Sequence, residues 1–161
     1  MRYHANCSMN LVDELHAVCA ALVGAGIRHA ICGGIAVTIY GATRTTKDID
    51  ILVSPDDLEQ AIEVVRPLGY KFPALPMVFE EGTGRERHVQ RVSKILAGDH
   101  LVIDFLLEVA AFSGFLAGRI VVNTSAGPLV VVSRDVLVRM KRMAGRPQDA
   151  ADIEKLETSD E

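Results

Sequence analysis

Three aspartates stand at positions where a carboxylate could do chemistry. Asp48 and Asp50 lie in the segment Asp48–Val53, which we predict to be a strand. Side chains two residues apart on a strand point to the same face, so these carboxylates project side by side, roughly 7 Å apart at the backbone. Asp104 interrupts a second apolar strand, Leu101–Leu107. Burying a carboxylate there is costly unless a cation or a set of donors compensates its charge.

Three carboxylates on one face suit a pair of divalent cations, Mg²⁺ or Mn²⁺. Hard cations prefer oxygen ligands and are often shared between a few carboxylates and the phosphates of a substrate. One ion would hold the β- and γ-phosphates, and the other would lower the pKa of an acceptor hydroxyl. Asp104 is then a ligand or general base on the acceptor side. The alternative is a structural aspartate bonded to an arginine or to backbone N–H groups.

A glycine pair and a polar loop precede the first two aspartates. Gly33-Gly34 follows a predicted strand and opens a helix, so backbone N–H groups there could approach a phosphate. Arg44 and Thr46 in the next loop offer a guanidinium fork and a hydroxyl to phosphate oxygens. A tight turn and a solvated loop are the structural alternatives.

The hydrophobic pattern predicts the elements that must position these residues. Predicted helices are a first one from Leu11 that ends at Gly24, then 35–40, 56–65, one that Ser133 caps and that runs through Met143, and 147–156. Predicted strands are 29–32, 48–53, 87–96, 101–107, 120–122 and 129–132. The last four form two hairpins, turning at 97–100 and around Gly127-Pro128, and 70–84 is irregular or edge structure. We expect an α+β fold, a mixed sheet with helices packed on it, and a single domain over 1–161.

Two stretches of the sequence resemble a known signature. They are Gly33-Gly34-Ile35-Ala36 and Gly41-x-x-Arg44-x-Thr46-Lys47-Asp48-Ile49-Asp50. This pattern resembles the DNA polymerase β-like nucleotidyltransferase superfamily, and is most similar to its minimal, single-domain branch with the AbiEii-type toxin nucleotidyltransferases. The tail Lys141-x-x-x-x-Arg146-Pro147-x-Asp149-x-x-Asp152 is similar to the helical ending of that branch. Residues 55–99 carry no such motif.

The resemblance implies transfer of a nucleoside monophosphate from a nucleoside triphosphate such as ATP. It implies a nucleotidyltransferase-like sheet with flanking helices and a C-terminal helical hairpin, and it makes an antitoxin partner an expectation. It assigns Gly33 and Gly34 to the phosphate loop, the three aspartates to metal, and Lys141 to the nucleotide. For Lys141 the alternative is a helix–helix corner held by ion pairs. The superfamily often carries Gly-Ser where this chain has Gly33-Gly34.

The composition of the chain limits the kinds of partner that we expect. The chain has 161 residues and a formal net charge of −4, which argues against a broad nucleic-acid surface. It has no apolar run long enough to cross a bilayer, and its cysteines have no C-x-x-C spacing, so we expect a cytoplasmic protein with reduced thiols. The acceptor stays open between a tRNA, a protein and a small molecule, although a basic cluster over 85–94 mildly favours an anionic one. A non-catalytic nucleotide-binding or interaction module and a purely structural domain are the competing hypotheses.

Overall fold

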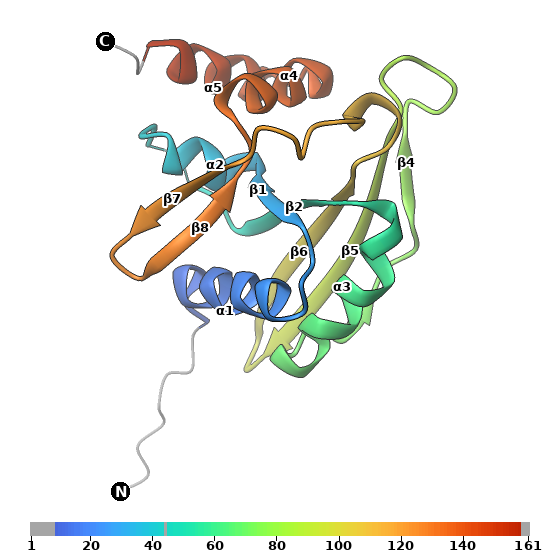
Figure 1. Ribbon diagram of the computed structural model, residues 1–161, viewed down its shortest axis with the longest axis vertical. Helices are drawn as coiled ribbons and strands as arrows, with labels where there is room; N and C mark the ends of the chain where they lie inside the picture. Colours follow the sequence, from blue (N-terminus) through green and yellow to red (C-terminus); the bar gives the residue numbers. More distant parts are fainter. Residues whose placement is uncertain (1–8, 44, 159–161) are drawn as a thin grey trace, which may run out of the picture.

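The computed structural model describes residues 9–43 and 45–158 of the chain. Its helices are α1 (Leu11–Gly24), α2 (Gly33–Ile39), α3 (Leu58–Val65), α4 (Arg134–Ala144) and α5 (Pro147–Thr158), with short 3₁₀ turns η1 (Pro55–Asp57), η2 (Arg66–Leu68) and η3 (Ala110–Phe112). Its strands are β1 (His29–Cys32), β2 (Asp48–Val53), β3 (Phe72–Pro73), β4 (Met77–Phe79), β5 (Arg87–Leu96), β6 (Asp99–Leu107), β7 (Ile120–Thr124) and β8 (Gly127–Val131). The predicted α+β class with a C-terminal helical pair is confirmed (Figure 1).

All of these strands join one mixed sheet in the order β3-β5-β6-β2-β1-β8-β7, with β4 also pairing β5. The β2–β6 and β1–β8 pairs are parallel, and the other pairs are antiparallel. Strands β2 and β6 lie at the centre, where Ile49, Ile51, Ile103 and Phe105 are fully buried. The central strands therefore supply both the core and a fixed platform for side chains on the opposite face.

Helices α1 and α3 pack beside each other, away from the C-terminal pair α4 and α5 (Figure 1). Helix α1 begins at an Asn10 cap, whose side chain accepts hydrogen bonds from the backbone of Val12 and Asp13. Its Glu14 accepts hydrogen bonds from Tyr70 and from Lys94 of β5, both at 2.8 Å. Because Lys94 and Arg91 alternate along β5, α1 covers the face of the sheet opposite to Arg91.

The observed elements differ from the predicted ones at several turns. Helix α2 begins two residues earlier than predicted, at Gly33, and the helix predicted over 56–65 starts as a 3₁₀ turn. The first hairpin turns over Ala97 and Gly98 alone, because both adopt positive φ angles of 50° and 85° that suit a tight two-residue turn.

The prediction of a turn at Gly127-Pro128 was wrong, since both residues open β8 and Asn123 pairs with Pro128. The segment over 70–84 forms two short edge strands, β3 and β4, on the outer side of β5. Within the described ranges, no helix is both long and apolar enough to cross a bilayer.

Candidate functional site

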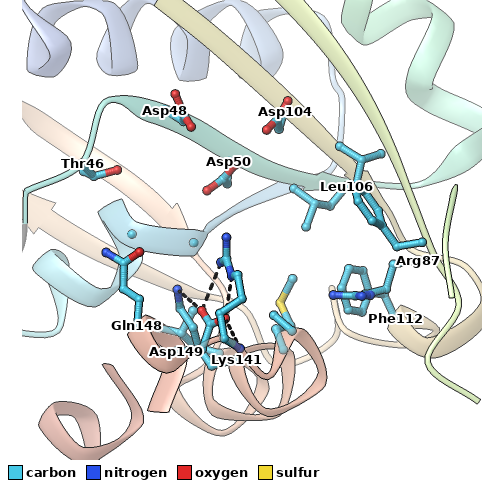
Figure 2. A pocket seen from close by; sticks show the side chains of 18 of the residues that line it. Thr46, Asp48, Asp50, Arg87, Asp104, Leu106, Phe112, Lys141, Gln148 and Asp149 are labelled. Carbon is cyan, nitrogen blue, oxygen red and sulfur yellow. Dashed lines mark hydrogen bonds and ion pairs between the residues drawn. The ribbon is translucent and has the colours of Figure 1, made fainter. Parts of the chain in front are cut away.

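Asp50 and Asp104 lie directly opposite each other on the neighbouring parallel strands β2 and β6. Asp48 precedes Asp50 by two residues and is opposite Val102, so all three aspartates project from the same face of the sheet. Figure 2 shows the three carboxylates at one wall of a single cavity. The structure thus brings together the three residues that the sequence singled out, from strands about fifty positions apart.

The cavity has a volume of about 580 Å³ and is bounded by the sheet, α2, α4 and the start of α5. Its polar side is lined by residues from the glycine turn, β2, β5, β6 and the C-terminal helices: Gly33, Gly34, Thr46, Asp48, Asp50, Arg87, Arg91, Asp104, Lys141, Arg146, Gln148 and Asp149. Its apolar side is lined by Met77, Phe79, Val89, Leu106, Phe112, Leu137, Met140 and Ala144. A volume of this size is typical of small-ligand sites.

Gly33 and Asp50 are packed against each other where β1 passes into α2. Gly33 has φ of +67°, and a Cβ built on it would overlap the Oδ2 atom of Asp50. The position therefore requires glycine twice, for its backbone angle and for the close approach of a carboxylate. Gly34, the second glycine of the pair, is buried and also lines the cavity.

The ionised form of Asp50 is energetically disfavoured. Burial, followed by the neighbouring Asp104 and Asp48 carboxylates, raises the pKa of Asp50 to about 7. The cations of Lys141 and Arg146 act in the opposite direction without cancelling these effects. A carboxylate that burial and like charges disfavour in this way is a natural ligand for an added cation.

Asp104 is held by an arginine. Arg91 lies opposite Asp104 on β5, and its Nε and Nη2 atoms donate to Oδ1 and Oδ2 at 2.8 and 2.9 Å. This is the arginine-bound arrangement that the sequence left open as the structural alternative. Among the residues described, no group of three His, Cys, Asp or Glu side chains is gathered closely enough to hold a metal ion as it stands. Carboxylate oxygens are suitable ligands for Mg²⁺, but the third carboxylate, that of Asp104, is hydrogen-bonded to Arg91.

The residues expected to bind phosphate are placed unequally. Thr46 is half-buried and lines the cavity next to β2, whereas Arg44 lies outside the described residues. Lys141 is only 5% exposed, and its Nζ lies 3.3 Å from Asp149 (Figure 2). The same Nζ lies 3.1 Å from Asp152. Lys141 therefore forms the ion-paired corner between α4 and α5 that was the alternative to nucleotide contact, while still bordering the cavity.

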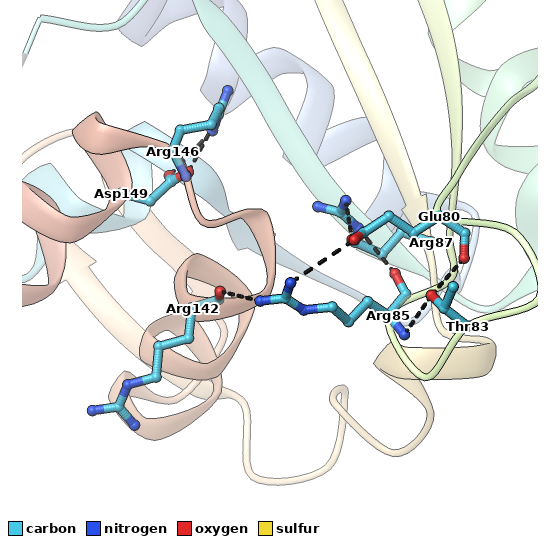
Figure 3. Close-up of polar contacts among 7 residues, drawn as sticks. All are labelled: Glu80, Thr83, Arg85, Arg87, Arg142, Arg146 and Asp149. Atoms are coloured by element: carbon cyan, nitrogen blue, oxygen red, sulfur yellow. Dashed lines mark hydrogen bonds and ion pairs between the residues drawn. The ribbon is translucent and has the colours of Figure 1, made fainter.

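Arg146 is the more accessible cation of this corner. Its Nε and Nη2 donate to Asp149 at 2.7 and 3.1 Å, and its side chain is 65% exposed (Figure 3). It lines the cavity, and its charge lowers the pKa of Asp50. Sequence reasoning left Arg146 open between the helix corner and a functional role, because nothing in its spacing distinguishes an arginine that faces a cavity.

The basic cluster over 85–94 is divided by the alternation of β5. Arg87 and Arg91 face the cavity, whereas Lys94 reaches α1 on the other face and His88 contacts Glu86. Arg87 donates to Glu80 at 3.0 Å (Figure 3). The period-two pattern of a strand could have separated these residues from the sequence alone. Met77 and Phe79 come from a segment without any motif, and no sequence signal indicated them.

No family profile matches the sequence, and no curated protein is significantly similar to it. Solved structures do share its fold. The lincosamide antibiotic adenylyltransferase LnuA, bound to lincomycin, superposes with a TM-score of 0.57 and 16% identity over 91% of this chain and 96% of that one. ANT(2″)-Ia in complex with adenylyl-2″-tobramycin superposes with a TM-score of 0.57 and 17% identity over 93% and 89%. A Thermotoga maritima protein assigned as a nucleotidyltransferase gives a TM-score of 0.60 and 14% identity over 94% and 97%.

These three proteins match this chain along nearly their whole lengths. At such low identity the likeness concerns the course of the backbone and not the chemistry of individual side chains. The fold predicted from the glycine and aspartate motifs is thereby confirmed, and the chain has the nucleotidyltransferase fold.

Proposed function

We propose that this protein is a metal-dependent nucleotidyltransferase, which moves a nucleoside monophosphate from a nucleoside triphosphate to an acceptor hydroxyl. The observation that carries this proposal is the direct opposition of Asp50 and Asp104 across β2 and β6, at the wall of a cavity bordered by Gly33 and Gly34. The nucleotidyltransferase fold supports it. ATP is the first nucleotide to test, because two of the proteins that share the fold are named for adenylyl transfer or its product.

The three aspartates of the cavity share one role in this proposal. Asp48, Asp50 and Asp104 would hold Mg²⁺ or Mn²⁺, which when bound supplies positive charge to the phosphates and acidifies the acceptor hydroxyl. Asp104 would share its two oxygens between the cation and Arg91, which would weaken its hydrogen bonds to the guanidinium.

The remaining polar residues would bind the nucleotide. Gly33, Gly34 and Thr46 would orient the triphosphate, together with Arg44. Arg146 would contact the phosphates directly, and Lys141 would hold Asp149 in place beneath it.

The experiment that tests transfer is labelling by each of the four α-³²P-labelled nucleoside triphosphates, with Mg²⁺ and a fractionated cell extract. We expect label to enter one fraction (RNA, protein or small molecules) with release of pyrophosphate. Asp50→Asn and Asp104→Asn should each abolish labelling while leaving the fold intact. Full labelling by either variant would remove that residue from the mechanism, and no labelling by the native protein with any nucleotide or fraction would reject the proposal.

A second candidate is a non-catalytic nucleotide-binding or interaction module, as in a toxin–antitoxin-like system with an antitoxin partner. The Arg91–Asp104 pair favours it, because an arginine already satisfies the third carboxylate. Binding of a nucleoside triphosphate with Mg²⁺ raises the melting temperature in both cases, since a ligand of the native state stabilises it. Pyrophosphate release with any acceptor pool distinguishes the enzyme from the module.

A further inference from the structure

An apolar row of side chains lies immediately beside the Asp104–Arg91 pair. Leu106 pairs with Val89 and Val89 pairs with Met77, across β6, β5 and β4. Leu106 follows Asp104 by two residues and Val89 precedes Arg91 by two, so this row shares the face of the carboxylates at a distance of about 7 Å along the strands. All three side chains are only partly buried, and all line the cavity.

Other elements extend this row into a compartment. Phe112 of η3 and Met140 of α4 line the same cavity. The loop over 80–86 reaches α4, where Arg85 donates to the backbone oxygen of Arg142 at 3.3 Å (Figure 3). We refer to Met77, Val89, Leu106, Phe112 and Met140 as the apolar wall.

The charged groups around the apolar wall already form ion pairs with one another. Arg91 binds Asp104, and Arg85 and Arg87 share the carboxylate of Glu80, at 3.8 and 3.0 Å. Of the other carboxylates that line the described cavity, Asp149 is bound to Lys141 and Arg146, which leaves Asp48 and Asp50 for the proposed cation. Beside the apolar wall, a polycation would meet three arginines and no carboxylate that lacks an arginine partner. A polyanion would meet these three arginines against the two carboxylates of Glu80 and Asp104, an excess of one positive charge, on a protein of net charge −4.

We propose that the acceptor is a small, electrically neutral molecule whose hydroxyl is carried on an apolar body that packs against the apolar wall. That this molecule is an acceptor rests on the proposed function, but its binding can be tested without nucleotide. The cavity volume of about 580 Å³ fits a small molecule rather than a macromolecule lying within it.

The test is a homologous series of neutral probes, methyl, n-butyl and n-hexyl β-D-glucoside, bound to the full chain below their micellar concentrations. Affinities are measured by ligand-observed NMR in saturating Mg²⁺, so that Asp48 and Asp50 are not free to bind amines, with tobramycin as the polycationic probe. Each methylene buried against the wall should improve affinity by up to about fourfold, and tobramycin should bind more weakly than hexyl glucoside. Equal affinities along the series, or tighter binding of tobramycin, would overturn the inference.

A matched pair of isosteric variants locates the binding. Val89→Thr places a hydroxyl in the apolar wall and should weaken the dependence of glucoside affinity on alkyl length. Val78→Thr makes the same change on β4, at a residue paired with His88 on the opposite face, and should leave the dependence unchanged. If both variants behave alike, the apolar wall is not the site.

A separate titration with ATP and Mg²⁺ distinguishes the two proposals. A protein that binds ATP and transfers label but shows no dependence on alkyl length retains the proposed function and refutes the apolar acceptor. A protein that binds the alkyl series at Val89 but neither binds ATP nor transfers label has the apolar site without the proposed function.

Discussion

Arg91 donates two hydrogen bonds to Asp104, at 2.8 and 2.9 Å, from the residue directly opposite on the neighbouring strand. The pair stands at the point where the proposed cation would bind. Since both carboxylate oxygens accept from the guanidinium, a cation and Arg91 compete for the same atoms. In the proposed function, a cation bound at Asp104 would therefore weaken this pair.

Arg91→Gln should raise the affinity of the nucleotide-free protein for Mn²⁺ by about tenfold, because the ion no longer displaces a charge-assisted pair worth about 1.5 kcal/mol or more. The same change should lower the free energy of unfolding by about 1–3 kcal/mol, since Asp104 is left without its partner. Mn²⁺ binding is measured by electron paramagnetic resonance and stability by urea denaturation. Arg66→Gln, in an exposed pair with Glu63, is the control. An unchanged Mn²⁺ affinity would show that Asp104 is not a ligand.

Asp50 should make the stability of the metal-free protein fall with rising pH. Its pKa is about 7 in the folded protein against an ordinary value of 3.8. Below about pH 4 the group is protonated in both states, so its ionisation costs nothing; between about 4 and 7 the unfolded chain has released the proton and the folded one retains it. The stability that Asp50 contributes in acid is therefore lost as the pH rises through this window.

The measurement is the free energy of unfolding in EDTA from pH 4.5 to 8, for the native protein and Asp50→Asn. The difference between them should grow in favour of the variant up to about pH 7 and then level off. Glu81→Gln, in an exposed loop, should run parallel to the native protein. Saturating Mg²⁺ should reduce the difference, because a cation stabilises the ionised carboxylate. A difference that is constant with pH would contradict the raised pKa.

Gly33→Ala should damage the protein beyond the cost of its backbone angle. A positive φ costs a non-glycine residue about 1–2 kcal/mol, and at Gly33 the new methyl group would also displace the Asp50 carboxylate. Gly26→Ala is the matched control, since Gly26 has φ of +70° and nothing within 4 Å of the added Cβ. We expect Gly33→Ala to lose more stability than Gly26→Ala and also to lose ATP binding. Equal losses of stability with intact ATP binding would exclude the proposed role of Gly33.

The elements of this fold could be predicted because local patterns determine them. The strands at His29–Cys32 and Asp48–Val53 were predicted with the observed bounds, and so was the start of α5 at Pro147. A short apolar run bounded by turn residues, or proline after a helix-ending glycine, is sufficient for such an assignment. The shared face of Asp48 and Asp50 follows from strand alternation alone.

The contacts between distant segments could not be predicted in the same way. The pairing of Asp50 with Asp104 depends on the register of two strands that are far apart in the sequence. The binding of Asp104 by Arg91 depends on a third strand, and the sequence offered several arginines for that role. The edge strands β3 and β4 lack any alternating pattern of their own, because β5 provides their hydrogen bonds.

Lys141 should prove to be a structural cation. Its side chain is 6% exposed and lies between Asp149 and Asp152, so Lys141→Met would remove a cation that two buried carboxylates share. Breaking a buried pair in this way costs about 3–5 kcal/mol, which urea denaturation would detect. Lys155→Met, which removes an exposed amine bonded to the backbone oxygen of Thr43, should cost far less. A Lys141→Met protein of native stability that no longer binds ATP would instead support the nucleotide contact implied by the resemblance.

Arg146 should carry the affinity for the triphosphate. The Nε and Nη2 atoms of Arg146 donate to Asp149, so its Nη1 donors stay available. The Arg146 side chain is 65% exposed and lines the cavity. Arg146→Gln should weaken ATP binding by about tenfold or more and AMP binding much less, because charge-assisted bonds to the outer phosphates are lost. Arg142→Gln is the control, since that side chain is 62% exposed but bonded to Glu157 outside the cavity. Calorimetric titration of both variants with ATP and AMP decides the matter: equal ATP affinities would assign the phosphates to other residues, whereas a loss confined to Arg146→Gln would place them above the α4–α5 corner.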